Sequence, residues 1–223
     1  MRMKFLKPVL VLVLLSLVYG IPAIASAPKF TKNDIERLQP LLNSERIKYF
    51  FGNYGVEQLS ISSKDFSSSR ISNLYSQDDH GKKIMRTLAI VQRVDAISPL
   101  LANEHRKIQA GGSIGTVMKE AGWKVIKTPI FFGSTHLSKN LLAWMRVSDA
   151  KRGEVFIYDL LVTKAPMPKP LPYCTIIEIY SPDYLNSRWI KALSKESHPT
   201  TSTASIRKLM ASVRDFVRDF PSP

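Results

Sequence analysis

Residues 154–162, with the sequence EVFIYDLLV, place apolar side chains on both sides of one extended segment. Successive side chains of a strand point to opposite faces, so Val155, Ile157 and Leu161 share one face with Asp159, while Phe156, Tyr158, Leu160 and Val162 make the other face apolar. Such a strand belongs in the interior of a sheet whose two faces are both covered. The chain must therefore build a sheet with other elements packed on each side, and Asp159 needs a polar partner there.

Other segments have the composition of strands and are joined by short turns, which favours antiparallel pairing. The predicted helices come in groups rather than after every strand. We therefore expect the α+β class, with one antiparallel or mixed sheet of five to seven strands and helices packed on it. The predicted strands cover residues 46–61 (around a turn), 70–76, 83–94, 123–134, 141–147, 154–164 and 173–180, and the predicted helices cover residues 31–44, 99–110, 113–121, 181–195 and 204–220.

The N-terminus has the layout of a secretory signal. A basic start is followed by an uncharged apolar run, then by Gly20 and Pro22, and then by small residues. We expect a signal peptide over residues 1–25, with cleavage after Ala25, followed by a single domain over residues 28–223. The alternative is an uncleaved anchor, because residues 8–27 carry no charge and are just long enough to span a bilayer. The expected location is periplasmic or secreted, and the membrane would be contacted only through this segment if it is not cleaved.

The chain is strongly basic, with 32 Lys and Arg against 18 Asp and Glu. Without the three basic residues of the signal, 29 remain against 18, a net charge of +11. A positive field attracts anions, although here most basic residues are dispersed among acids. Aromatic and basic residues do not alternate as they do in nucleic-acid-binding proteins, so we expect no nucleic-acid partner. The single cysteine, Cys174, excludes an intramolecular disulfide.

Residues 110–123, AGGSIGTVMKEAGW, contain the densest use of glycine in the chain. A glycine-rich turn at a helix start can bind an anion through its amides, which makes Gly112, Ser113 and Gly115 candidate ligand-binding residues. A phosphate-binding loop would require lysine after the last glycine, where Thr116 stands, and a dinucleotide-binding turn would follow a strand. The alternative is a corner between two helices, in which Gly111 or Gly112 adopts positive φ and Gly115 lets another element approach closely.

Charged residues inside apolar strands supply the remaining candidates. Asp159 and Glu178 are candidate catalytic carboxylates, with His105 as a candidate base, and Arg86 and Arg146 are candidate anion ligands. The alternative is that these groups form cross-strand ion pairs or reach water at the strand ends. No two histidines have the spacing of metal ligands, and we predict no metal and no cofactor.

These features favour an exported bacterial binding or accessory module for an anionic ligand or an envelope component. The first alternative is an envelope hydrolase or isomerase that uses the strand carboxylates. The second is an interaction subunit that docks through the amphipathic C-terminal helix predicted over residues 204–220. The sequence contains no familiar catalytic motif, which favours a protein that is not an enzyme.

Overall fold

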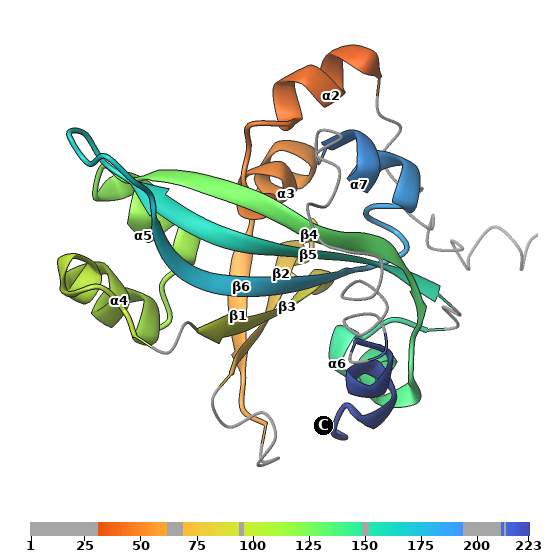
Figure 1. Cartoon of the computed structure of the whole chain (residues 1–223). Helices are drawn as coiled ribbons and strands as arrows, with labels where there is room; N and C mark the ends of the chain where they lie inside the picture. Colours follow the sequence, from red (N-terminus) through yellow and green to blue (C-terminus); the bar gives the residue numbers. More distant parts are fainter. Residues whose placement is uncertain (1–30, 62–68, 94–95, 149–151, 194–210, 212) are drawn as a thin grey trace, which may run out of the picture.

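A computed structural model describes residues 31–61, 69–93, 96–148, 152–193, 211 and 213–223 (Figure 1). Six strands form one sheet in the order β1-β2-β3-β6-β5-β4, and every neighbouring pair is antiparallel. The strands are β1 (Gly55–Leu59), β2 (Arg70–Gln77), β3 (Lys83–Arg93), β4 (Lys124–His136), β5 (Arg152–Thr163) and β6 (Leu171–Tyr180). The predicted α+β class and sheet are confirmed, and β5 lies inside the sheet, as its two apolar faces require.

Helices cover both faces of this sheet. They are α2 (Lys32–Leu38), α3 (Asn43–Phe51), α4 (Ala102–Gln109), α5 (Ile114–Glu120), α6 (Lys139–Met145) and α7 (Ser187–Leu193), with the 3-10 turn η2 (Pro99–Leu101) before α4. Residues 213–219 are also helical. Figure 1 shows α6 and the C-terminus together on one side of the sheet, away from α2, α3 and α7.

The two faces of the sheet bury separate apolar clusters. On the first, which we call the helical face, Tyr158 and Ile176 of the sheet share a cluster with Ile47 of α3, Met118 of α5 and Ile190 of α7. On the second, which we call the C-terminal face, Ile157 and Ile179 share a cluster with Leu141 of α6, Val217 and Phe220. Because the sheet is covered on both sides, Glu178 in the central strand β6 is shielded from water, while Asp159 in β5 is half-buried.

The structure differs from the sequence prediction in four segments. The helix predicted over residues 31–44 is divided between α2 and the start of α3, and residues 181–186 of the helix predicted over residues 181–195 are not helical. Residues 141–147 were expected to be a strand, but most of them lie in helix α6, whose N-cap Ser138 accepts a hydrogen bond from the Leu141 amide. Residues 46–51 were expected to be extended, but they complete helix α3. This helix turns Asn43, Ser44 and Arg46 inward, so the sequence shows no simple apolar stripe there.

No helix in the described part of the chain is long and apolar enough to cross a bilayer. The export signal predicted for residues 1–25 lies outside the described residues, as does the beginning of the helix predicted over residues 204–220.

Candidate functional site

Glu178 of β6 is the most buried carboxylate of the predicted site residues, with 4% of its surface exposed. It points to the helical face and lies directly across from Phe156 of β5 in the sheet register. The hydroxyl of Tyr158 donates to Glu178 Oε1 at 3.1 Å, and the hydroxyl of Tyr180 donates to Oε2 in a short hydrogen bond. Burial, reinforced by the charge of Glu178, raises the pKa of both tyrosines well above the ordinary value, so both remain hydroxyl donors.

Lys127 of β4 points to the same face, across from Leu160 of β5. Part of the side chain is exposed, but its ammonium nitrogen is shielded from solvent, and no described residue offers it a hydrogen-bond acceptor. It lies 4.7 Å from the centre of the Tyr158 ring. Burial lowers the pKa of Lys127 to about 8, and the negative charge of Glu178 opposes that shift. A shielded ammonium of this kind is costly to bury and is able to bind an anion.

The charges around this ammonium do not cancel. Glu178, Arg46, Glu45 and Lys119 act on Lys127 electrostatically. The charged residues that line the same cavity as Lys127 are Arg70 and Glu178, so two cations and one anion leave a net charge of +1 on its walls. Lys119 and Glu45 form an ion pair at 2.7 Å, and the Arg46 guanidinium donates to the carbonyls of Leu38 and Gln39 at the end of α2. Lys127, in contrast, has a shielded ammonium with no hydrogen-bond acceptor among the described residues.

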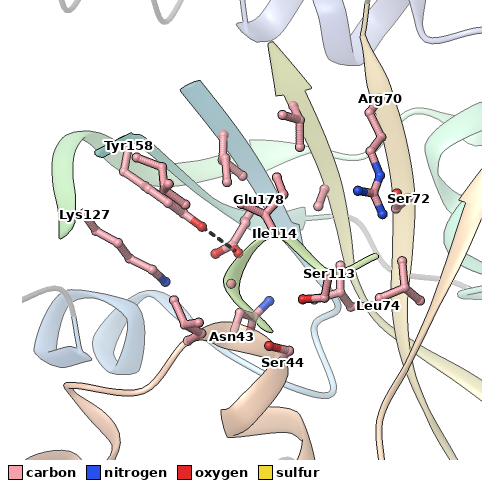
Figure 2. Close-up of a pocket in the computed structure, with 17 residues that line it drawn as sticks. Asn43, Ser44, Arg70, Ser72, Leu74, Ser113, Ile114, Lys127, Tyr158 and Glu178 are labelled. Carbon is pink, nitrogen blue, oxygen red and sulfur yellow. Dashed lines mark hydrogen bonds between the residues drawn. The ribbon is translucent and has the colours of Figure 1, made fainter. Parts of the chain in front are cut away.

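Lys127, Tyr158 and Glu178 line a cavity between the sheet and the starts of α3 and α5 (Figure 2). We call it the central cavity, and its volume is about 80 Å³. Figure 2 shows the Lys127 nitrogen and the Tyr158 hydroxyl pointing into the same space above Asn43. Its lining is divided by chemistry: the polar residues are Asn43, Ser44, Arg70, Ser72, Ser113, Lys127, Tyr158 and Glu178, and the apolar residues include Leu42, Val56, Leu74, Val91, Leu160 and Ile176.

Buried hydrogen bonds hold α3 in place at the floor of the cavity. The Asn43 amide donates to Thr87 Oγ1 at 3.0 Å and accepts from the Tyr184 hydroxyl at 3.0 Å. These bonds connect α3 to β3 and to the turn before α7. Because every partner is buried, the start of α3 is fixed relative to the sheet, and the cavity has a defined shape.

The glycine stretch forms a corner between two helices, and its last residues reach the cavity. Gly111 has φ of +105° and Gly122 has φ of +79°, and each follows the last turn of a helix in the left-handed conformation that ends helices. A Cβ at Gly112 would lie 2.9 Å from the Lys107 carbonyl oxygen, and a Cβ at Gly115 would collide with Leu42. The predicted corner, with Gly115 allowing a close approach, is confirmed.

The candidates in this stretch have different surroundings. Ser113 and Gly115 line the central cavity, whereas Gly112 does not. Arg70, which also lines it, donates to the carbonyls of Ile108, Gly111 and Gly112 at 2.7–3.2 Å. Its guanidinium therefore stabilises the carboxyl end of α4, where a positive charge is favourable.

The structure does not bring the three candidate catalytic residues together. Asp159 points to the C-terminal face, where it accepts a hydrogen bond from Thr175 at 2.6 Å, while Glu178 points to the helical face. His105 of α4 lies on the helical face, with Nδ1 3.1 Å from the Tyr173 hydroxyl, and does not line the cavity. These side chains cannot act on one substrate atom.

Arg86 and Arg146 also lie outside the cavity. Arg86 donates to Ser76 at 3.0 Å and stacks over the Phe51 ring, with 3.6 Å from the guanidinium carbon to the ring centre. Arg146 ends α6 with φ of +52° and forms an ion pair with Glu57 at 3.1 Å. Both arginines thus serve packing and ion pairing at these positions.

Sequence reasoning singled out Glu178 and missed its hydrogen-bond partners Tyr158 and Tyr180, and it also missed Lys127 in the cavity wall. The sequence contained a sign that Lys127 points inward. Val125 and Lys127 occupy alternate positions of one strand, so their side chains share a face, and this is the face on which the paired strand β5 is apolar. From the sequence, Tyr158 and Tyr180 are indistinguishable from ordinary aromatic residues of the core. Only the structure shows that both hydroxyls donate to Glu178.

Within the described ranges, no three side chains of His, Cys, Asp or Glu gather in a way that could hold a metal ion. A comparison with protein-family models gives no match, and a search of curated proteins finds none similar to this chain.

Proposed function

We propose that the protein is an exported binding or accessory module that holds a small monoanion in the central cavity. The observation that carries this proposal is the shielded ammonium of Lys127, which lies at the cavity wall with no acceptor among the described residues. The local charge of +1 suits a ligand with a single negative charge. The basic composition of the chain adds a long-range attraction for anions.

The rest of the lining supports a ligand with a short apolar part. Binding sites for small molecules are mostly apolar, with a few polar groups that orient the ligand. Here the shielded ammonium of Lys127 would bind the charged end, while Leu160 and Ile176 would contact the apolar part. The hydroxyls of Ser44, Ser72 and Ser113 belong to the rest of the cavity lining. Glu178 is turned toward two tyrosine hydroxyls, so its charge is already solvated by the protein.

The two alternatives have less support. The candidate hydrolase or isomerase residues Asp159, Glu178 and His105 lie apart, as described above. In the interaction-subunit hypothesis the apolar stripe of the C-terminal helix would face a partner, but Val213, Val217 and Phe220 are buried against the sheet. Export is proposed on the sequence signal alone.

Butyrate is a suitable first probe, because it combines one carboxylate with a short apolar chain. We expect isothermal titration calorimetry at neutral pH to detect its binding, and we expect Lys127→Met to weaken it by about 10- to 100-fold, the range for losing one hydrogen bond to a charged group. The variant should fold, because it replaces a desolvated cation by an apolar side chain of similar length.

Lys139→Met is the matched control, because Lys139 is an exposed lysine at the start of α6. It should bind butyrate as tightly as the unaltered protein. If Lys127→Met binds butyrate as well as Lys139→Met does, the proposed site is wrong.

A further inference from the structure

The central cavity is too small for most metabolites. Its volume of about 80 Å³ is roughly half that of the engineered cavity of about 150 Å³ that holds one benzene molecule. It can therefore accept a head group and a few carbon atoms. A longer ligand must leave through an opening and continue along another surface.

Such a surface begins at Lys127. A groove with a volume of about 790 Å³, which we call the edge groove, lies between β4 at the edge of the sheet and the segment that joins α2 to α3. Leu42 and Lys127 line both the central cavity and the edge groove. The partly exposed side chain of Lys127, with its shielded ammonium, lies where the two spaces meet.

The edge groove is mainly apolar along its walls. Its apolar lining comes from four segments far apart in the sequence and includes Pro40, Leu41, Val125, Pro129, Phe156 and Leu193. Its polar lining residues besides Lys127 are Glu36, Gln39, Arg46 and Lys124. Glu36 and Lys124 are exposed to water, and the Arg46 guanidinium donates to the carbonyls of Leu38 and Gln39. An alkyl chain in this groove would be removed from water, at a gain of about 0.8 kcal/mol for each buried methylene.

We infer that the natural ligand is a single-chain amphipathic carboxylate whose head group binds the Lys127 ammonium while its alkyl chain lies in the edge groove. This inference rests on the proposed function, because it requires an anion at Lys127. Charge complementarity favours a carboxylate over a phosphate: Arg70, Lys127 and Glu178 leave one positive charge on the cavity lining, which a monoanion balances and a dianion exceeds. The same surface thus explains both the shielded ammonium and the apolar groove beside it.

The test is a chain-length series measured by calorimetry on the full-length protein with butyrate, hexanoate and octanoate, with octanol as the uncharged analogue. Each fully buried methylene should raise the affinity about fourfold, so octanoate, which has four methylenes more than butyrate, should bind about 200-fold more tightly. Octanol should bind at least 10-fold more weakly than octanoate, because it cannot use the ammonium.

Leu41→Asn tests the groove with little disturbance of the cavity, because Leu41 is half-buried and lines only the groove. It should leave butyrate affinity unchanged and lower octanoate affinity about tenfold. Leu142→Asn, the same change at a half-buried position of α6, should alter neither affinity. If Leu41→Asn does not fold, Val125→Thr keeps the side-chain shape, adds a polar group to the groove, and should weaken octanoate binding.

The outcomes separate the two proposals. If butyrate binds through Lys127 but octanoate binds no more tightly, the inference about the groove is wrong and the proposed function stands. If none of the carboxylates binds, the proposed function fails, and the inference fails with it. If octanol matches octanoate, the groove binds apolar chains without the ammonium, which also overturns the inference.

Discussion

Replacing Phe220 by alanine should lower the free energy of unfolding by about 3–5 kcal/mol, the range for removing a fully buried aromatic side chain. Phe220 is completely buried on the C-terminal face of the sheet, in the cluster that contains Val213 and Val217. Its backbone is also held, because the Asn140 side chain donates to the Phe220 carbonyl and the Trp144 indole donates to the Pro221 carbonyl at 2.8 Å. The C-terminus is therefore part of the core.

Chemical denaturation of Phe220→Ala measures this effect, with Arg214→Ala as the control. Arg214 is exposed on the same helical segment, so its replacement should change the free energy of unfolding by no more than about 0.5 kcal/mol. A Phe220→Ala protein as stable as the control would show that the C-terminal segment is dispensable for folding. The apolar stripe of the C-terminal helix would then be free to bind a partner, as the interaction-subunit hypothesis requires.

Replacing Glu178 by alanine should destabilise the protein to a similar extent, by about 3–5 kcal/mol. The change leaves the buried hydroxyls of Tyr158 and Tyr180 without their acceptor, and it removes the negative charge that favours the charged form of Lys127. A buried group that loses its partner is more destabilising than the original pair was stabilising. Glu178 is therefore predicted to be essential for the folded state of the cavity.

Glu178→Gln is the matched variant for that experiment. Its amide oxygen still accepts a hydrogen bond, so we expect a smaller loss, about 1–2 kcal/mol. Thermal or denaturant unfolding of both variants gives the comparison. Equal stabilities of Glu178→Ala and Glu178→Gln would mean that the tyrosine hydroxyls do not depend on Glu178, which would contradict the hydrogen-bond network described above.

The sheet was predictable because the strands show alternation and short turns, which are local signals. The interior position of β5 followed from the two apolar faces of residues 154–162. The helix corner followed from the glycines, since a left-handed residue after a helix favours glycine. Gly111 and Gly122 take that conformation.

The two misassigned helices show where local signals fail. The five apolar residues of α6 after Asn140 have no period that separates helix from strand, and Ser138 as an N-cap was the signal that went unused. Helix α3 buries Asn43 and Arg46 because they bond to Thr87 and to the end of α2. Such partners are distant in sequence, so polar residues on a buried helix face cannot be recognised from the segment itself.

The candidate site was predictable only in part for the same reason. Glu178 was noticeable as a charge in an apolar strand, but the side of the sheet on which Asp159 and Glu178 lie depends on strand order and register. Lys127 comes from β4, and it lines the same cavity as Glu178 because only β5 lies between β4 and β6. The constellation is therefore a property of the sheet topology, which the sequence alone leaves open.

The central claim is that the shielded ammonium of Lys127 binds an anion in the cavity. The charged groups that act on it come from the neighbouring elements and are Glu178 of β6, Glu45 and Arg46 of α3, and Lys119 of α5, while Tyr158 of β5 lies beneath it. Below pH 8 the ammonium is charged and can bind a carboxylate. As the pH rises through about 8 the proton is lost, so anion affinity should fall.

The most direct measurement is therefore an NMR titration of the Lys127 side chain, assigned by comparison with Lys127→Met, with and without saturating butyrate. We predict a pKa of about 8 in the free protein and a higher pKa when butyrate is bound, because the anion favours the charged form. A pKa that butyrate leaves unchanged would contradict an anion site at Lys127.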